Sequence, residues 1–245
     1  MTTNLPQPAQ PGPGHQRRWQ WLFAASGLLP VLLLLVDPPD TMLLIYSIFV
    51  AGWFGRRRLA QIVRRLRLPA WMLALAATLL VGGLTESLAW AGSYLAHDPN
   101  PALLHPQLAY DLLFSPGIYA AWALAWMAAG RRYVYGLGHV FVLQGVYGVF
   151  VEQQGAVFIQ GLRALPLGLV FWLYVFVVYG SAMGLAVLLW PPGLLATGRC
   201  RGWLRIPAVL ALNIALTAVT ALAWGGLLHP LPIPEPRPIW EAPFW

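Results

Sequence analysis

The chain has 245 residues, of which 59% are hydrophobic and only 9% are charged. Soluble domains carry about 25% charged residues, so this composition excludes an ordinary soluble protein. The formal net charge of +7 comes from arginine alone, because the sequence contains no lysine. A retinal Schiff base needs a lysine amine, and a retinal-binding protein is therefore excluded as well.

The N-terminal part begins with residues 1–18, which are rich in proline and glycine and are expected to form a disordered cytoplasmic tail. Two apolar blocks follow at 19–36 and 41–55, joined by the turn sequence Asp37-Pro38-Pro39-Asp40. Either both blocks cross the membrane or they form a short re-entrant hairpin. Residues 56–68 hold six arginines and an apolar face with i, i+3, i+4, i+7 spacing, which predicts a basic amphipathic helix on an anionic membrane surface.

Five longer apolar stretches follow, each about as long as the roughly 20 residues that cross a bilayer as a helix. They predict spans at 70–95, 107–130, 134–158, 168–190 and 206–228. The expected fold class is therefore all-α: a polytopic integral membrane helix bundle over residues 19–228 with about seven transmembrane helices. The first two of these helices are the segments that could instead form the short re-entrant hairpin. Residues 229–245, rich in proline and aromatics, are expected to be an extended extracytoplasmic tail.

The distribution of arginine predicts the orientation. With the N-terminal tail in the cytoplasm, thirteen arginines lie on the cytoplasmic side and only Arg163 and Arg237 lie outside. The acidic residues of the loops and tail all fall on the outer side. We therefore expect a multi-pass protein of the cell (plasma) membrane, the inner membrane in bacteria, with arginine-rich cytoplasmic loops and an extracytoplasmic C-terminus.

Three carboxylates, Glu86, Asp111 and Glu152, lie inside or at the edge of predicted spans. An ionisable side chain at membrane depth is costly and usually faces a protein interior or a cavity that holds water. Glu86 is 16 residues and Glu152 is 18 residues past the cytoplasmic start of its span, which places them about 24 and 27 Å from that start. Asp111 begins its span from the outside, and His105 lies in the loop above. These four residues are the catalytic candidates.

Helical spacing aligns polar, small and aromatic side chains with these carboxylates on several predicted helices, and on the span 107–130 the inward-facing stripe is Asp111, Ser115, Tyr119, Trp122 and Trp126. One interpretation is a set of packing seams. The other is a polar pocket in the outer half of the bilayer, and the ligand-binding candidates in it are Glu86, Trp90, Asp111, Tyr119, Gln144, Glu152 and Gln153.

Cofactor chemistry has weak support in the sequence. His139, near the inner end of its span, is a candidate axial ligand for haem or chlorin, and the alternative is a packed imidazole. No metal-binding motif such as H-E-x-x-H occurs. The arginines are interpreted as topology determinants, so no nucleic-acid partner is expected.

Three hypotheses for function remain open. The first is a non-enzymatic ligand-binding protein or membrane-complex subunit, whose partners are the lipid bilayer and other membrane subunits or a lipophilic ligand. The second is a membrane-embedded enzyme that acts on a lipid or isoprenoid substrate by carboxylate acid–base chemistry. The third is a small proton-coupled transporter, although the chain shows no internal repeat.

Overall fold

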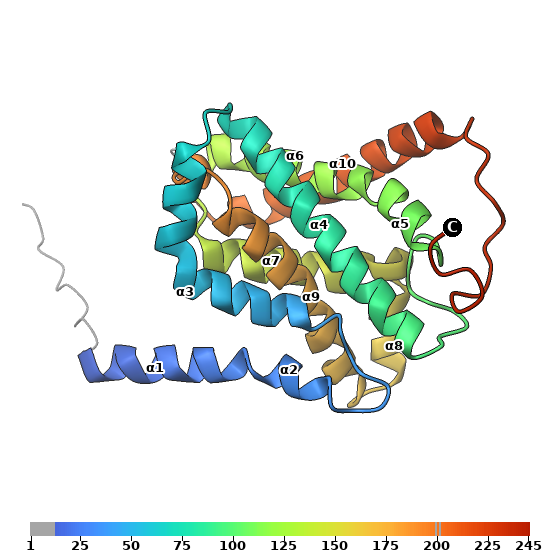
Figure 1. Ribbon diagram of the computed structural model, residues 1–245. Helices are drawn as coiled ribbons and strands as arrows, with labels where there is room; N and C mark the ends of the chain where they lie inside the picture. Colours follow the sequence, from blue (N-terminus) through green and yellow to red (C-terminus); the bar gives the residue numbers. More distant parts are fainter. Residues whose placement is uncertain (1–12, 199, 201) are drawn as a thin grey trace, which may run out of the picture.

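The computed structural model describes residues 13–198, 200 and 202–245, and this part of the chain is all-α (Figure 1). The elements in chain order are α1 (Pro13–Ser26), α2 (Leu29–Leu33), α3 (Leu44–Arg65), α4 (Ala70–Leu95), α5 (Leu108–Phe114), α6 (Pro116–Arg132), α7 (Leu137–Val151), the 3₁₀ turn η1 (Glu152–Gly155), α8 (Ala156–Arg163), α9 (Gly168–Leu188), the 3₁₀ turn η2 (Leu194–Ala196) and α10 (Arg205–Leu228).

Helix α9 is the centre of the bundle and packs against α7, α3, α4 and α8, while α10 packs mainly on α6. Glycines allow α7 and α9 to approach closely. A Cβ on Gly145 would lie 2.6 Å from the backbone oxygen of Phe176, and one on Gly180 would lie 2.6 Å from the backbone oxygen of Phe141. Close packing through small residues is the usual basis of helix association in membranes, where lipid weakens the hydrophobic drive.

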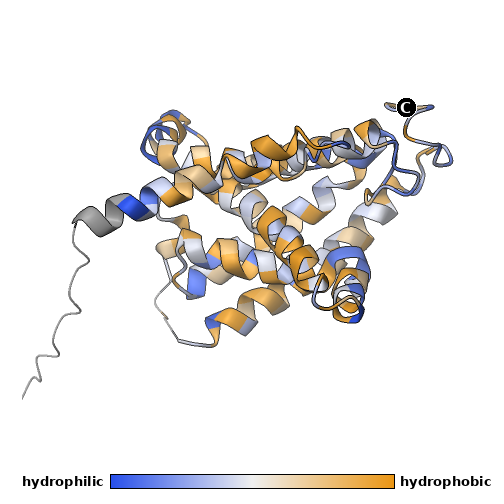
Figure 2. Ribbon diagram, turned by 90° about the horizontal axis from the view of Figure 1, so that it is seen from below, coloured by the Kyte–Doolittle hydropathy of each residue, from blue (hydrophilic) through white to orange (hydrophobic). Residues whose placement is uncertain are grey.

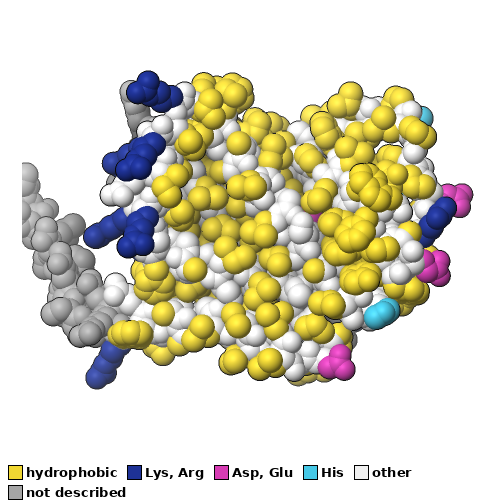
Figure 3. All heavy atoms as spheres, viewed as in Figure 1, with side chains coloured by type: hydrophobic (Ala, Val, Ile, Leu, Met, Phe, Trp, Pro, Cys, Tyr) yellow, Lys and Arg dark blue, Asp and Glu magenta, His cyan; other side chains and the backbone are white. Residues whose placement is uncertain are grey.

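Four helical segments of the described chain are long and apolar enough to cross a membrane: Ala70–Leu95, Leu108–Arg132, Gly168–Leu188 and Arg205–Leu228. Hydrophobic residues predominate along the helices (Figure 2), and apolar side chains cover much of the face seen in Figure 3 between the two ends of the bundle. On α10, for example, Leu222 is 78% exposed and Val219 is 60% exposed. Such a surface needs an apolar environment, so the protein associates with a membrane. The expected count of seven spans is not confirmed.

The N-terminal region differs from the sequence-based expectation in two ways. Helix α1 begins at Pro13, so the last residues of the expected disordered tail are helical, while 1–12 lie outside the described residues. The block 41–55 and the basic segment 56–68 are not separate elements, because α3 continues from Leu44 to Arg65. Figure 1 shows that α3 bends along its length, with its first part beside α1. The ring of Phe23 joins the two helices through an edge contact with Trp53.

The predicted span 134–158 is wrong as a single helix. Helix α7 ends at Val151, and the chain then passes through three successive residues with left-handed backbone angles: Gln153 (φ 48°), Gln154 (φ 58°) and Gly155 (φ 87°). A left-handed conformation costs an L-residue roughly 1–2 kcal/mol. The break places Glu152 at the end of α7 instead of within the expected helix.

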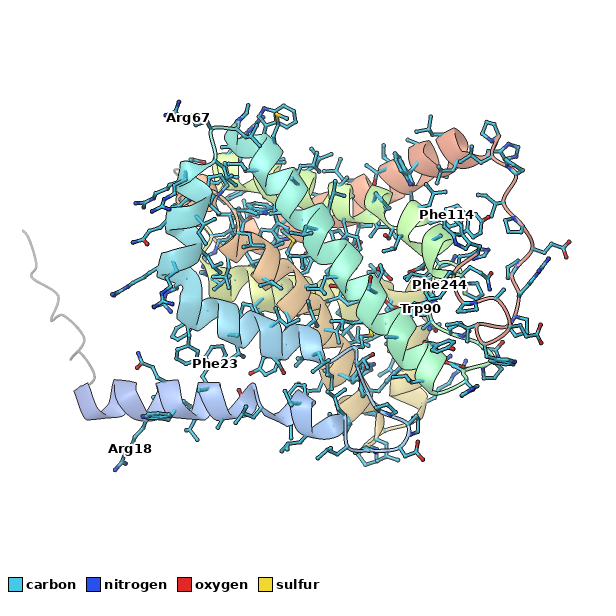
Figure 4. The ribbon with its side chains drawn as sticks, in the orientation of Figure 1. Arg18, Phe23, Arg67, Trp90, Phe114 and Phe244 are labelled. Carbon is cyan, nitrogen blue, oxygen red and sulfur yellow. The ribbon has the colours of Figure 1, made fainter. Side chains whose placement is uncertain are left out.

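The C-terminal tail folds back over the end of the bundle that carries α5. The backbone oxygens of Pro243 and Phe244 accept hydrogen bonds from the amides of Leu108 and Ala109. These amides lie at the start of α5, where the helix itself offers no acceptor. Phe244 also stacks on Trp90 of α4 with ring centroids 5.4 Å apart (Figure 4). The tail contains no helix from residue 232 to its end, and it covers this end of the bundle.

Candidate functional site

Glu86 and Glu152 converge on one cavity of about 600 Å³ near the end of the bundle that the C-terminal tail covers. This volume is in the usual range for small-molecule sites. Helices α4, α6, α7, α9 and α10, the turn η1 and two loops supply its walls. The lining residues are Met42, Thr85, Glu86, Ala89, Pro101, Ala102, Leu103, Leu104, Ile118, Tyr119, Trp122, Tyr147, Val151, Glu152, Gln153, Gln154, Val178, Tyr179, Ala182, Thr217 and Ala221.

Glu86 is held by a tyrosine of the neighbouring helix. The hydroxyl of Tyr119 donates a hydrogen bond to Glu86 Oε1 at 2.8 Å. Its ring can lie against α4 because residue 82 is glycine: a Cβ there would lie 2.4 Å from Tyr119 Cγ. Tyr119 is 5% exposed, so the hydrogen bond fixes the carboxyl at the cavity wall.

Glu152 has the same kind of partner. The hydroxyl of Tyr179 on α9 donates a hydrogen bond to Glu152 Oε2. Here too a glycine makes room, because a Cβ on Gly148 would lie 2.3 Å from Tyr179 Cγ. The left-handed turn that follows brings Gln153 and Gln154 to the same cavity. Strained backbone of this kind persists where the surrounding structure holds it, and it is common at functional sites.

Asp111 lies behind the cavity wall and is fully buried. Its Oδ1 accepts hydrogen bonds from the amides of Leu104 and His105, at 2.9 and 3.2 Å. Its Oδ2 has no hydrogen-bond donor among the described residues, and its carboxyl is within hydrogen-bonding reach of Glu86. Two carboxylates repel each other when both are charged. The Glu86–Asp111 pair is therefore suited to sharing one proton.

The other predicted site residues are divided between the cavity and its surroundings. Gln153 lines the cavity. Gln144 lies deeper in the bundle, where its Oε1 accepts a hydrogen bond from the indole of Trp126 at 2.8 Å. Trp90 lies at the outer end, stacked on Phe244, and His105 is buried beneath the loop with its Nδ1 accepting from the amide of Gln107. None of these last three lines the cavity.

Two tyrosines of the site were missed by sequence reasoning. Tyr179 holds Glu152, and Tyr147 donates a hydrogen bond to Thr217 Oγ1 at 2.8 Å, which connects α7 to α10. Trp122 was expected to face inward but was not among the site candidates, and it contacts the rings of Tyr119, Tyr147 and Tyr179. The sequence feature that could have identified these tyrosines is a hydroxyl group within an otherwise apolar predicted helix, because such a group needs a hydrogen-bond partner.

Cofactor ligands are not gathered at this site. Over the described chain, no group of three His, Cys, Asp or Glu side chains is arranged to hold a metal ion. His139 lies at the start of α7, where its Nδ1 accepts a hydrogen bond from the amide of Gly136 at 3.2 Å. This contact holds the imidazole at the N-terminal end of α7.

Charge is separated along the bundle (Figure 3). Most of the arginine side chains visible in Figure 3 lie at the end of the bundle that carries Arg18 and Arg67 in Figure 4, whereas the acidic and histidine side chains lie towards the opposite end together with one basic side chain. The cavity belongs to the acidic end. Among the described residues that line it, none is basic.

Comparison of the chain with protein families, with curated proteins and with solved structures gives no match. Fold and site together define a class: a helical, membrane-associated protein with an internal acidic and aromatic cavity.

Proposed function

We propose that this is a multi-pass protein of the cell membrane with a cytoplasmic N-terminus and an extracytoplasmic C-terminus. The separation of arginines from acids along the bundle supports this orientation. The single cysteine, Cys200, is exposed in the loop before α10 and serves as a natural reporter. A membrane-impermeant maleimide should label it only after cells are permeabilised. In a Cys200→Ser, Glu241→Cys variant, the same reagent should label intact cells, and the reverse pattern would refute the orientation.

Within that membrane, the protein acts as a non-enzymatic ligand-binding protein or complex subunit whose outer-half cavity holds a small ligand. One observation carries this proposal: Glu86 and Glu152, from different helices, are each held by a tyrosine at the wall of the same cavity of about 600 Å³. A packing seam would need neither the volume nor two oriented carboxyls.

The experiment fills the cavity by enlarging a lining side chain on α10. Ala221 lines the cavity from α10 although it is exposed, whereas Leu222 beside it points outward and is 78% exposed. Native mass spectrometry of protein extracted in lipid nanodiscs should show a bound small molecule in the wild type and in Leu222→Trp. Ala221→Trp should lose it. Wild-type protein without any bound molecule, or equal occupancy in all three, would contradict ligand binding.

A membrane-embedded enzyme is the second candidate. Two carboxyl–phenol pairs facing one cavity are suited to acid–base chemistry on a lipid or isoprenoid substrate. Glu86→Gln and Tyr119→Phe separate the two proposals. In a binding protein these substitutions should change only the amount of bound ligand, and the mass of the ligand should stay the same. In an enzyme they should cause a substrate to accumulate that the wild type converts to a product of different mass.

A proton-coupled transporter is the third candidate, and the discontinuous helices favour it. Helix α7 ends beside the cavity at η1, where Gln153 and Gln154 leave the helical conformation. Transporters place such breaks at their binding sites. Ligand uptake into proteoliposomes driven by a proton gradient would distinguish this function from binding alone.

A further inference from the structure

The chemistry of the cavity wall identifies the class of ligand, provided that the proposed function holds. Glu86 and Glu152 accept hydrogen bonds from Tyr119 and Tyr179, which are neutral donors and bring no positive charge to the carboxyls. The buried Asp111 adds a third carboxyl beside Glu86. Because no basic side chain is among the described lining residues, the lining supplies no cation to compensate charge on these carboxyls.

Aromatic rings form the wall next to these carboxyls. Trp122 is at the centre of this cluster, with ring centroids 4.8 Å from Tyr119, 5.2 Å from Tyr179 and 6.0 Å from Tyr147. All four rings line the cavity. Aromatic faces beside carboxylates bind ammonium groups, including quaternary ones, by combining cation–π attraction with ion pairing.

The indole N–H of Trp122 gives an independent indication of a ligand. Trp122 is only 4% exposed and lines the cavity, yet its Nε1 has no hydrogen-bond partner among the described residues. The Tyr147 hydroxyl is nearby, but it does not form a hydrogen bond of adequate geometry with the indole. A buried donor without an acceptor costs about 1–3 kcal/mol. An oxygen atom on a bound ligand would satisfy it.

The remaining lining side chains are mostly aliphatic and come from several elements, among them Met42, Ile118, Val151, Val178 and Ala182. They provide a surface for an apolar group. We infer that the cavity binds an amphiphilic organic cation: an ammonium group between Glu86 and Glu152 against the aromatic wall, an oxygen acceptor at Trp122, and an apolar substituent against the aliphatic wall.

The test compares two probes that match in shape and differ in charge. Benzyl(2-hydroxyethyl)dimethylammonium has the ammonium, the hydroxyl and an apolar ring, and 3,3-dimethyl-4-phenylbutan-1-ol is its carbon isostere. By equilibrium dialysis against purified full-length protein, the cation should bind at least about tenfold more tightly than the isostere. Glu86→Gln and Glu152→Gln should each remove most of this preference. Glu235→Gln, which removes an exposed acid of the tail, should leave it unchanged.

The outcomes separate this inference from the proposed function. Equal binding of the two probes to the wild type, or tighter binding of the isostere, would overturn the cation inference and leave ligand binding in place. Binding of neither probe would overturn the cation inference, and the native mass spectra would then decide ligand binding separately. The comparison uses wild-type protein, so it does not depend on the folding of a variant.

The same ammonium chemistry occurs in a free solute and in a lipid headgroup. Competition against the cationic probe distinguishes these sources. Displacement by choline assigns a free cation, and displacement by dihexanoyl phosphatidylcholine but not by choline assigns a headgroup. Displacement by either supports the inference, whereas failure of both to displace the probe at a hundredfold excess would place the probe outside the ammonium site and overturn it.

Discussion

The substitution Gly82→Ala tests the packing that orients Glu86. The new Cβ would lie 2.4 Å from Tyr119 Cγ, whereas ordinary van der Waals contact begins at 3.4 Å, so the ring must move by at least about 1 Å. Tyr119 now donates to Glu86 across 2.8 Å, and a displacement of that size takes the pair beyond hydrogen-bonding distance. The carboxyl would then lose its fixed position at the cavity wall.

The energy follows from three contributions. Overpacking of a close helix crossing costs about 1–3 kcal/mol, and a lost hydrogen bond within a membrane bundle costs about 1 kcal/mol. Replacement of a helical glycine by alanine returns about 1 kcal/mol. We therefore expect Gly82→Ala to destabilise the protein by about 1–3 kcal/mol, with a weaker preference for the cationic probe.

Gly83→Ala is the matched control. It changes the same residue type at the next position of α4, where the new Cβ would meet only Leu112 at 3.8 Å, an ordinary contact. Thermal unfolding in detergent should show Gly83→Ala to be neutral or stabilising. In a Tyr119→Ala background, Gly82→Ala should lose its cost, because the clash is gone. This prediction is refuted if Gly82→Ala and Gly83→Ala change the unfolding temperature equally, or if the effects of Gly82→Ala and Tyr119→Ala on stability simply add in the double mutant.

Three further predictions concern the surroundings of the cavity. Gln153→Gly should stabilise the protein by about 1 kcal/mol because glycine adopts the left-handed backbone at this position without strain. The control Gln160→Gly, within α8, should destabilise the protein by about the same amount. Thermal unfolding in which both substitutions shift stability in the same direction would contradict this prediction. Gln144→Leu should cost about 1–3 kcal/mol, because the buried indole N–H of Trp126 loses its acceptor, and adding Trp126→Phe should recover part of the loss in denaturation assays. Truncation after Arg237 should speed hydrogen exchange at Leu108 and Ala109 at least about tenfold, since their acceptors are on Pro243 and Phe244; unchanged protection would show that the tail does not hold α5.

The candidate site could be located from the sequence because charge is rare in apolar helices. Glu86 and Glu152 were conspicuous for that reason, and helical spacing correctly placed Tyr119 and Trp122 on the inner face of their helix. Tyr179 and Tyr147 were not identified, because a tyrosine in a run such as Leu173–Tyr179 or Val140–Val149 has the composition of an ordinary buried helix. Their role depends on contacts with Glu152 and Thr217 that are remote in the chain.

The errors in the fold have a related cause. No proline marks the end of α7, so its apolar run appeared to continue through Glu152 and past the left-handed turn at Gln153. Gly55 and Arg56 suggested a boundary between an apolar block and a basic helix, but α3 continues through them. Local composition changed at that point without a break in the helix, and hydropathy alone cannot distinguish these two cases.

The most direct test of the central claim is an electron cryomicroscopy structure in lipid nanodiscs with 4-iodobenzyl(2-hydroxyethyl)dimethylammonium. The strong density of iodine fixes the position of the probe. Our account predicts that the probe lies in the cavity with its ammonium between Glu86 and Glu152 and its hydroxyl at the Trp122 indole. Density for the probe elsewhere, or a structure in which the two carboxyls do not face one cavity, would contradict it.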